Sequence, residues 1–532
     1  MLCFESEMSE LPRPKSQHEQ RLWDVAIIGA GMGGGFTARA LSDAGHDVLL
    51  IDYGNEDISS PGSTTLSDDQ ETRLSESKWP TMSTFEVDGV INRCYPTLGV
   101  GVGGSTNLYA AALQRFDSRD IDLDSASSHS PGRWPISYDD LLPYYEVAER
   151  MLHVCGTPDP LDSHAVNNIA EPPPLGPCDA DFLQFFQEKG MHPYRLHVGI
   201  RYRPGCDECL GRLCYKNCRA DVRSVLAESQ NKPTIMARSE VLRLEATSNR
   251  VTRAIVRQGD KQITIQAKVF VLAAGAIHTP KLLLQSSNDR WPNGLANRSG
   301  LVGCNLMFHA AQTFALWPSK TLAATGPRKS IAFTDFYEVD GKRCGSVQST
   351  GFELGYGEFL MHLYGLFDRH GATRMIRIIR PLLRIPALLT VKILGRGTIF
   401  ACLIEDMPYR ENRVMLDENE ADGVRVTYKI KDELRDRVTL FRQLLTKRLK
   451  GRRMVFLSQD VELNYGHPCG TCVMSNDPCT GVVDPDCRVH DIANLFITDA
   501  SFMPTSAATN PSLTIAANAL RVSSQINRML AR

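Results

Sequence analysis

The stretch that decides the fold lies near the N-terminus and reads Val25-Ala26-Ile27-Ile28-Gly29-Ala30-Gly31-Met32-Gly33-Gly34. Its apolar, β-branched beginning predicts a buried parallel strand, and glycines follow at once in G-x-G-x-x-G spacing. In such a turn the first glycine allows the tight bend, the second lets a pyrophosphate approach the backbone, and the third lets the helix pack on the strand. The stretch therefore predicts the first turn of a Rossmann-like dinucleotide-binding domain.

The residues that follow complete this unit. A helix is predicted over 36–44 with its N-terminal amides towards the phosphates, and Gly45 ends it. A second strand is predicted over 46–51, and Asp52 stands 18 residues after Gly34, where an acid hydrogen-bonds a ribose hydroxyl. A glycine-rich turn in an ordinary α/β core would leave Asp52 unexplained, so a dinucleotide site is the better interpretation.

A second glycine-rich run favours FAD over NAD as the dinucleotide: Gly99-Val100-Gly101-Val102-Gly103-Gly104-Ser105-Thr106-Asn107. This run is too long and too flexible to belong to a core, and a fold with a single NAD site has no use for it. Further strands of the same domain are predicted within 234–242 and over 268–272.

Groups suited to proton handling gather at the other end of the chain. They stand in His467-Pro468-Cys469-Gly470-Thr471-Cys472, in Asp499-Ala500-Ser501 and in Asn510-Pro511-Ser512. Together with the glycine runs, these stretches resemble the glucose–methanol–choline (GMC) oxidoreductase family, as do 134–145, 275–284 and 302–306. The matches follow the family's order from residue 24 to residue 525. The resemblance implies an α/β fold in which a Rossmann-like FAD-binding domain is interleaved with an α+β substrate-binding cap, and it implies FAD-dependent oxidation of an alcohol to a carbonyl.

The resemblance also implies roles for individual residues. His467 is expected to take the hydroxyl proton while flavin N5 accepts the hydride, because an unperturbed histidine titrates near working pH. Asn510 occupies the second catalytic position, which places the chain in the subgroup with a His/Asn pair. No histidine occurs in 107–112, where some members attach FAD covalently, so non-covalent FAD is expected. The expected FAD-binding residues are Gly29, Gly31, Gly33, Gly34, Asp52, Gly99, Gly103, Gly104, Ser105, Asn107, Val241, Ala274, Asp499, Ala500, Asn510 and Pro511, whereas His278, His309 and His490 are expected to be structural.

At 532 residues the chain exceeds one ordinary core, so two interleaved domains are expected after a flexible N-terminal arm over 1–21. The predicted FAD-binding domain combines 22–115, 221–301 and 462–532. The predicted substrate-binding domain combines 116–220 and 302–461.

Four cysteines crowd into one loop, Cys206, Cys209, Cys214 and Cys218. Zinc sites usually separate two cysteine pairs by a dozen residues or more, so zinc fits poorly. The tight spacing is closer to an iron–sulfur loop, and certain FAD-dependent glucose dehydrogenases of the resembled family carry such a cluster at a similar place. Free thiols or local disulfides remain the alternatives. A cluster would offer electrons a route away from the flavin, which favours a dehydrogenase over an oxidase.

Composition excludes several other classes of function. The formal charge of −2 gives no basic surface for nucleic acid. The polar N-terminus lacks the pattern of a secretory signal, and fifteen cysteines, an odd count, argue against a fully paired disulfide framework; a reducing, cytoplasmic location is therefore expected. No run of 18 apolar residues predicts a bilayer-spanning helix.

The sequence does not identify the alcohol substrate. A sugar or glycoside and a hydrophobic or cyclic alcohol are both compatible with it, and oxygen, a quinone or a redox protein remain open as the electron acceptor. The stretch 374–389 alternates basic and apolar residues, which fits a cap helix with solvated arginines or a surface that dips into a membrane. The alternative function is that of a flavoprotein that binds FAD for electron transfer or in a structural role, without alcohol chemistry.

Overall fold

The N-terminal stretch forms the centre of a sheet that carries the dinucleotide-type turn. Strand β1 (Leu22–Ile28) pairs in parallel with β2 (Val48–Ile51) on one side and with β9 (Lys261–Leu272) on the other. The last four residues of β1 and all of β2 are buried, which explains their unbroken apolar sequences, because helices or loops cover both faces. The predicted strand over 46–51 begins later, at Val48.

The full order of this seven-stranded sheet is β6-β2-β1-β9-β8-β7, with β20 also on β9. Strands β6 and β20 add in parallel, whereas β7 and β8 form an antiparallel extension. The additional strands are β6 (Thr234–Met236), β7 (Ser239–Ala246), β8 (Val251–Gln258) and β20 (Leu495–Ile497).

Helix α1 (Met32–Asp43) follows β1 and begins four residues before the predicted start at residue 36. The prediction was wrong because the glycines lie inside the helix, where close contacts leave no room for a side chain. A Cβ on Gly33 would meet the Thr498 carbonyl at 2.1 Å, and one on Gly34 would meet the Gly29 carbonyl at 1.8 Å. Gly45, at φ +88°, follows the helix as predicted.

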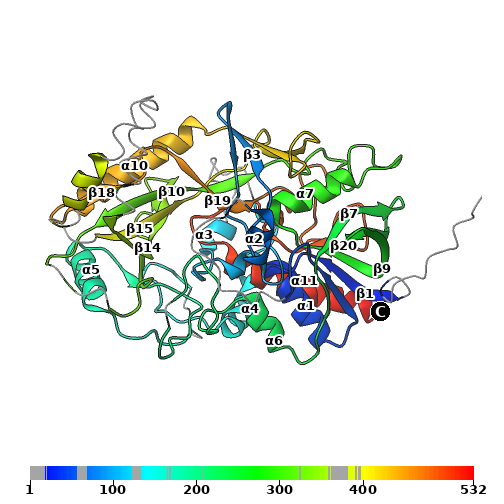
Figure 1. Cartoon of the computed structure of the whole chain (residues 1–532), viewed down its shortest axis with the longest axis horizontal. Helices are drawn as coiled ribbons and strands as arrows, with labels where there is room; N and C mark the ends of the chain where they lie inside the picture. Colours follow the sequence, from blue (N-terminus) through cyan, green and yellow to red (C-terminus); the bar gives the residue numbers. More distant parts are fainter. Residues whose placement is uncertain are drawn as a thin grey trace, which may run out of the picture.

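Three further helices gather around α1 on one side of the sheet (Figure 1). Helix α11 contacts both α1 and α4, and α6 contacts α1. They are α4 (Tyr138–Met151), α6 (Val222–Ala227) and α11 (Ser512–Leu530). Helix α7 (Gly275–Gln285) follows β9 and begins beside the turn after β1.

A second seven-stranded sheet lies on the left in Figure 1, in the order β18-β10-β15-β14-β11-β5, with β19 also paired to β10. Helices α5 (Pro177–Glu188) and α10 (Asp432–Arg448) share a core with one face of this sheet. The strands are β5 (Tyr194–Arg195), β10 (Met307–Leu316), β11 (Ile331–Phe333), β14 (Gly345–Leu354), β15 (Gly397–Ile404), β18 (Met454–Phe456) and β19 (Glu462–Cys469).

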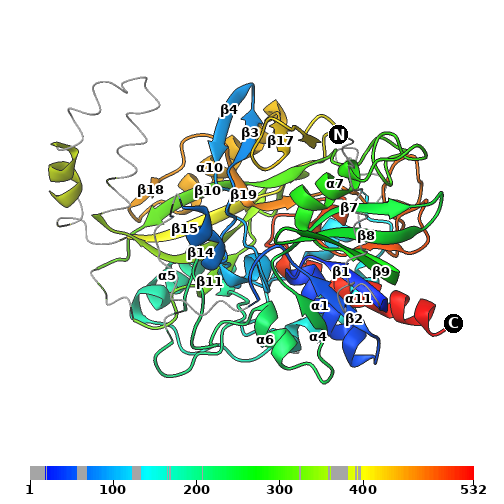
Figure 2. The same ribbon diagram turned by 45° about the vertical axis from the view of Figure 1, so that its right-hand side comes forward.

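Two small sheets complete the architecture. A four-stranded sheet has the order β16-β17-β3-β4, and β12 pairs with β13. Figure 2 shows β3, β4 and β17 above the region where the two large sheets meet. The remaining elements are α2 (Gln70–Ser75), β3 (Ser83–Val87), β4 (Val90–Cys94), η1 (Gly104–Asn107), α3 (Ser118–Ile121), β12 (Glu338–Val339), β13 (Lys342–Arg343), β16 (Arg413–Leu416), β17 (Val424–Tyr428) and η2 (Ala500–Phe502).

These strand pairings combine the two predicted domains. Strands β3 and β4 come from the predicted FAD-binding segment 22–115, yet β3 pairs with β17 from the predicted cap. Strand β19 opens the segment 462–532 and pairs with β10 of the second sheet. Hydrogen-bonded strand pairs therefore join segments that were predicted to belong to different domains.

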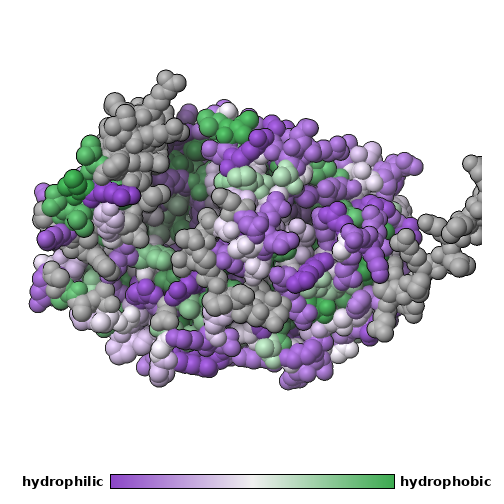
Figure 3. All heavy atoms as spheres, viewed as in Figure 1, coloured by the Kyte–Doolittle hydropathy of each residue, from purple (hydrophilic) through white to green (hydrophobic). Residues whose placement is uncertain are grey.

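The computed structural model describes residues 18, 21–56, 67, 69–122, 133–164, 166, 169–206, 208–320, 322, 325–356, 360, 382–389, 392 and 397–532. Residues 1–17, 19 and 20 of the predicted arm and 374–381 of the basic and apolar stretch lie outside this set. In the described part of that stretch, Leu382, Ile385, Leu388 and Leu389 are each at least half exposed, whereas Leu383 and Ala387 are buried. Figure 3 shows apolar residues gathered at the left edge of this face of the molecule. None of the described helices has the length and apolar character required to cross a bilayer.

Candidate active site

A cavity of about 690 Å³ joins the turn after β1 to the second sheet. Alternation along the strands produces its far wall, because successive side chains of a strand point to opposite faces. On β15, Phe400 and Cys402 enter the core shared with α5 and α10, whereas Ala401 and Leu403 line the cavity. On β10 the cavity-lining residues are Ala311 and Thr313.

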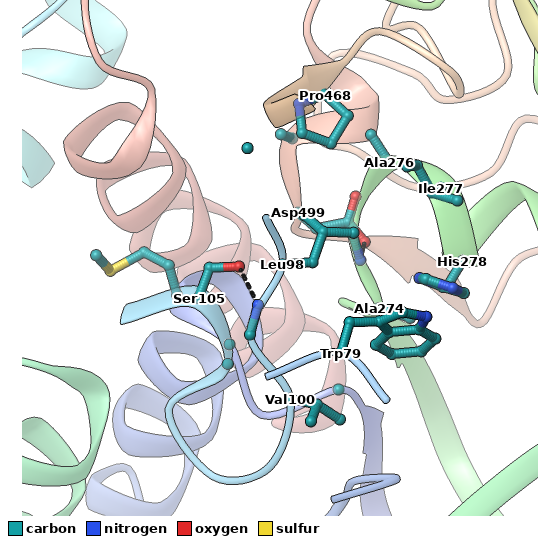
Figure 4. A pocket seen from close by; sticks show the side chains of 18 of the residues that line it. Trp79, Leu98, Val100, Ser105, Ala274, Ala276, Ile277, His278, Pro468 and Asp499 are labelled. Atoms are coloured by element: carbon teal, nitrogen blue, oxygen red, sulfur yellow. Dashed lines mark hydrogen bonds between the residues drawn. The ribbon is translucent and has the colours of Figure 1, made fainter. Parts of the chain in front are cut away.

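Most of the predicted cofactor residues line this cavity. They are Gly29, Gly31, Gly33, Asp52, Gly99, Gly104, Ser105, Val241, Ala274, Asp499, Ala500, Asn510 and Pro511. Figure 4 shows part of the wall, with Trp79 beside His278 and with Ser105 hydrogen-bonded to the backbone of Gly99.

Gly34, Gly103 and Asn107 are predicted cofactor residues that do not line the cavity. Gly34 permits the contact between α1 and the turn at Gly29. Gly103 has φ +108°, and a Cβ there would meet the Asn107 side chain at 2.3 Å. The side-chain amide of Asn107 in turn donates to the Val102 carbonyl at 3.0 Å. Gly103 and Asn107 therefore hold the conformation of the second glycine run without lining the cavity.

The glycine loops leave the room that a pyrophosphate needs. A Cβ on Gly31 would meet nothing within 4 Å, and Gly31 has an ordinary negative φ of −77°. Neither packing within the protein nor backbone strain therefore explains why a glycine occupies this position. The same residue lines the cavity at the start of α1, where backbone amides point outward and favour an anion. These features fit the phosphates of FAD.

Asp52 ties three backbone segments together beneath the cavity. One carboxylate oxygen accepts from the Ala30 amide at 2.7 Å, and the other accepts from the amides of Gly54 and Gly101 at 2.9 Å each. Burial raises the pKa of this carboxyl, and the three amides oppose that shift. Asp52 thus connects both glycine runs to the end of β2.

Asp499 performs a similar task on the opposite side. Its carboxylate accepts from the Gly275 amide at 2.9 Å and from the Thr279 hydroxyl at 2.5 Å, both at the start of α7. The other oxygen accepts from the amide of Ser501 at 2.9 Å and from its hydroxyl. The C-terminal stretch is therefore fastened to α7 where both line the cavity.

His467 and Asn510, the predicted catalytic pair, line the same cavity although they come from different elements. His467 lies on β19, and Asn510 lies just before α11. The Asn510 amide nitrogen donates to Gln114 at 3.0 Å and to Gln348 at 2.9 Å. Gln114 directs its own amide nitrogen to the Tyr194 hydroxyl at 2.9 Å and its oxygen to Asn510. The carbonyl oxygen of Asn510 is consequently left to accept from another group.

His309, predicted to be structural, controls the ring of His467. The Nε2 of His309 lies 3.1 Å from the carbonyl oxygens of both Ser506 and Ala507, so it must carry the proton. Its Nδ1 is then an acceptor, and it lies 2.8 Å from Nδ1 of His467. His467 therefore carries its own proton on Nδ1, and its Nε2 keeps a free lone pair.

The side-chain amide nitrogen of Asn464 also lies 3.2 Å from Nδ1 of His467. Because Nδ1 of His467 donates its proton to His309 over the shorter distance, it does not accept a hydrogen bond from Asn464. Burial lowers the pKa of His467 well below its usual range, and the neighbouring His309 and Lys329 add to that shift. The ring is therefore held neutral.

The cysteine loop is connected to the cavity wall through Arg219, which bonds to the carbonyls of both Cys209 and Tyr109. Cys206, Cys209, Cys214 and Cys218 contact one another, and all the cysteines among the described residues are free. The amides of Glu208 and Arg219 lie 3.4 Å from the sulfurs of Cys206 and Cys214, respectively. Within the described part of the chain, no group of three or more His, Cys, Asp or Glu side chains is arranged around the position of a single metal ion.

Arg219 connects this loop to the cavity wall. Its buried guanidinium donates to the carbonyl of Cys209, to that of Asn107 at 2.6 Å and to that of Tyr109 at 2.7 Å. Tyr109 lines the cavity. One side chain therefore spans from the cysteines to the segment after the second glycine run.

Sequence reasoning missed several residues of the site. Lys329, Gln114 and Gln348 have no motif around them, and they reach the site only through strand pairing and loop packing. His309 stands in a family-like segment and was predicted to be structural. His278 was predicted to be structural and lines the cavity, where its ring lies 4.0 Å from that of Trp79, centroid to centroid. His278 follows the Ala274-Gly275 turn, and that neighbourhood was the available signal.

Comparison with known proteins gives the family. Two models described as GMC oxidoreductase match residues 89–311 and 408–519, and the chain belongs to this family of oxidoreductases. It is 29% identical to the 6'''-hydroxyparomomycin C oxidase of Streptomyces lividus, over 96% of this chain and 92% of that protein. It is 28% identical to the fructose dehydrogenase large subunit of Gluconobacter japonicus, over 94% and 97%.

The fold agrees with solved structures as well. The formate oxidase of Aspergillus oryzae, studied for modification of its FAD, superposes with a TM-score of 0.64 at 16% identity. The match covers 95% of this chain and 98% of that one. The predicted α/β fold of the GMC family is confirmed.

Proposed function

We propose that this protein is an FAD-dependent enzyme that oxidises the CH–OH group of an alcohol to a carbonyl. One observation carries the proposal: a histidine with a free Nε2 lone pair lines the same cavity as a glycine cradle fit for a pyrophosphate. FAD would supply N5 of its isoalloxazine ring as the hydride acceptor.

The protein's own residues handle the proton and hold the substrate. Nε2 of His467 accepts the hydroxyl proton, and the buried, neutral ring is ready to do so without first losing a proton. Asn510, held by Gln114 and Gln348, offers its carbonyl oxygen to a substrate hydroxyl and thereby fixes the orientation of the C–H bond.

The competing function is electron transfer by a flavoprotein without alcohol chemistry. Anaerobic addition of alcohols should bleach the visible band of the oxidised flavin if the proposal holds. His467→Ala should slow this reduction by about 10²–10⁴-fold while FAD stays bound, the usual range for a positioned general base. His192→Ala is the matched control, because His192 is exposed and far along the chain from the catalytic pair. A His467→Ala protein that is reduced at the wild-type rate would contradict the assignment.

FAD is proposed to be non-covalent. The segment from Asn107 to Ala112 contains no histidine that could be joined to the flavin. Precipitation with trichloroacetic acid should release free FAD into the supernatant. Flavin that stays with the precipitate would refute this part of the proposal.

The alcohol is proposed to be a sugar or glycoside, or else a hydrophobic or cyclic alcohol. The sugar-like class is supported by curated relatives that include oxidases of paromomycin- and paromamine-type compounds and a fructose dehydrogenase. These relatives include both oxidases and dehydrogenases. We favour a dehydrogenase here because of the cysteine loop.

The cysteine loop is proposed to hold an iron–sulfur cluster that carries electrons away from the flavin. Four mutually contacting cysteines, two of them beside backbone amides, fit a polynuclear cluster better than a single ion. The cluster would accept single electrons from the reduced flavin on the side of the cavity where Arg219 connects the wall to the cysteine loop.

Iron analysis tests this part directly. Anaerobically purified protein should contain about three or four irons per flavin. Cys214→Ser and Cys218→Ser should lose that iron and slow transfer to dyes while alcohol still reduces the FAD, and Cys479→Ser, an exposed cysteine outside the loop, should change neither. Protein without iron would exclude the cluster, and rapid peroxide formation in air would then indicate an oxidase.

A further inference from the structure

Lys329 is a buried lysine in the wall of the cavity. It lies two residues before β11, and only 4% of its surface is exposed. Within the described part of the chain it forms no ion pair, and its ammonium reaches one acceptor, the Ser349 carbonyl, at 3.5 Å. An ammonium group so placed lacks the acceptors that three donors require.

The nearest acid is already occupied. Glu208, in the cysteine loop, accepts from the Tyr202 hydroxyl at 3.0 Å and from the backbone and side chain of Arg328 at 3.0 Å. Its charge favours the protonated form of Lys329 but does not complete its hydrogen bonding. Burial lowers the pKa of Lys329 to about 8, so the side chain is charged at neutral pH.

Lys329 lies at the catalytic end of the cavity. It lines the same cavity as His467, and its ammonium contacts Ser349, the neighbour of the Gln348 that binds Asn510. Its positive charge also contributes to the lowered pKa of His467. The cavity walls from β10, β14 and β15 contribute Ala311, Thr313, Gln348, Ala401 and Leu403, all of them uncharged.

The carboxylates of the cavity lie elsewhere. Among the described lining residues they are Asp52, Glu240, Asp422 and Asp499, and none comes from the second sheet. A cationic substrate would therefore meet Lys329 without a carboxylate to balance it. A hydroxyl or carboxylate of the substrate would instead supply the acceptors that Lys329 lacks.

We propose that Lys329 determines substrate specificity by donating hydrogen bonds to an oxygen of the substrate beside His467, which selects neutral or acidic polyhydroxy alcohols over cationic amino sugars. The inference rests on the proposed function, because it gives the substrate class of the same cavity.

Three probes that differ in charge test the inference: D-glucose, D-gluconate and D-glucosamine. Their binding to the flavin-loaded protein is read from perturbation of the flavin spectrum, and their turnover from anaerobic flavin reduction. The wild type should bind glucose and gluconate in preference to glucosamine. Lys329→Met should weaken binding of the first two by about 10-fold or more, the scale of a hydrogen bond to a charged group, with a smaller effect on kcat. Lys342→Met, an exposed lysine on β13, is the matched control.

A pH series adds a signature that a merely structural lysine would not give. The charged and titratable groups around Lys329 are Glu208, Arg328 and His467. Wild-type affinity for gluconate should fall as the pH rises above about 8, because Lys329 then loses its proton, and Lys329→Met should lack this limb.

Unchanged affinities in Lys329→Met, preference for glucosamine, or no binding of glucose and gluconate at millimolar concentrations would each overturn the inference. Failure of the proposed function is a separate result. If no alcohol bleaches the wild-type flavin while gluconate binding still depends on Lys329, the alcohol chemistry is refuted and the binding role stands.

Discussion

The imidazole ring of His467 lies in surroundings that oppose a positive charge. Its pKa is lowered mainly by burial and further by His309 and Lys329. The ring should therefore stay neutral as the pH falls through about 6.5, where an unperturbed histidine gains a proton. We expect the rate of flavin reduction by alcohol, measured anaerobically in a stopped-flow instrument, to stay level across that range. An acid limb centred at or above pH 6.5 would contradict this account.

His309 acts through the tautomer of its neighbour. Replacing it with leucine removes the acceptor for the Nδ1 proton of His467, so flavin reduction should slow by about five- to tenfold, the equivalent of one ordinary hydrogen bond. His309→Asn should recover much of the rate, because the asparagine oxygen can occupy the position of the lost Nδ1. Both variants should bind FAD normally in the flavin absorbance spectrum. Equal rates for the leucine and asparagine variants would show that the hydrogen bond is not the cause.

Substitutions at Gly31 and Gly34 distinguish an effect on cofactor binding from an effect on folding. Gly31→Val should give folded but colourless protein, because the new side chain would enter open space that the pyrophosphate needs. Gly34→Val should fail to fold or lose much stability, because a Cβ there meets the Gly29 carbonyl at 1.8 Å. Circular dichroism and flavin content measured together distinguish the two. A yellow Gly31→Val protein would refute the placement of the pyrophosphate.

At the scale of elements, α4 shows how a local signal supports the site. Ser137 and Asp140 form a capping box at its N-terminus, and just before it the Trp134 indole donates to Thr505 at 2.8 Å. The helix packs on α11, which begins directly after Asn510 and Pro511. A well-formed α4 therefore supports the segment that carries Asn510.

Ser137→Ala should lower the free energy of unfolding by about 1 kcal/mol, because one helix amide loses its acceptor. Chemical denaturation measures the change. Ser524→Ala is the control, because Ser524 lies inside α11, where alanine favours the helix. An equal loss in both variants would mean that capping is not the cause.

At the scale of the whole molecule, FAD would bind between elements that the chain supplies from distant segments. A ligand that binds only the folded state stabilises it by about 2.7 kcal/mol at one hundred times its Kd. Removal of FAD should therefore lower Tm by several degrees in differential scanning calorimetry, and added FAD, but not NAD, should restore it. An unchanged Tm would indicate that the cofactor contributes little to the assembly of the two sheets.

The sequence by itself determined the local units and their chemistry. The β-branched run, the glycine spacing, Asp52 and the His467-Pro468 stretch are contiguous patterns whose meaning depends on a few neighbouring residues, and the FAD-type fold and the family were read from them. The start of α1 was misplaced because glycine disfavours a helix locally, and only contacts with Thr498 and Gly29 explain its use there.

Only the tertiary structure decided how the catalytic end is built. Lys329 and Gln348 line the cavity, and His309 and Gln114 hydrogen-bond to His467 and Asn510 in its wall. Strand pairing and loop packing bring them there from distant parts of the chain, and such long-range contacts leave no periodic trace in the sequence. The tautomer of His467 and the charge beside it depend on distances of a few ångströms between side chains from different strands. Such distances are set by packing in three dimensions, which is why residue order alone did not reveal them.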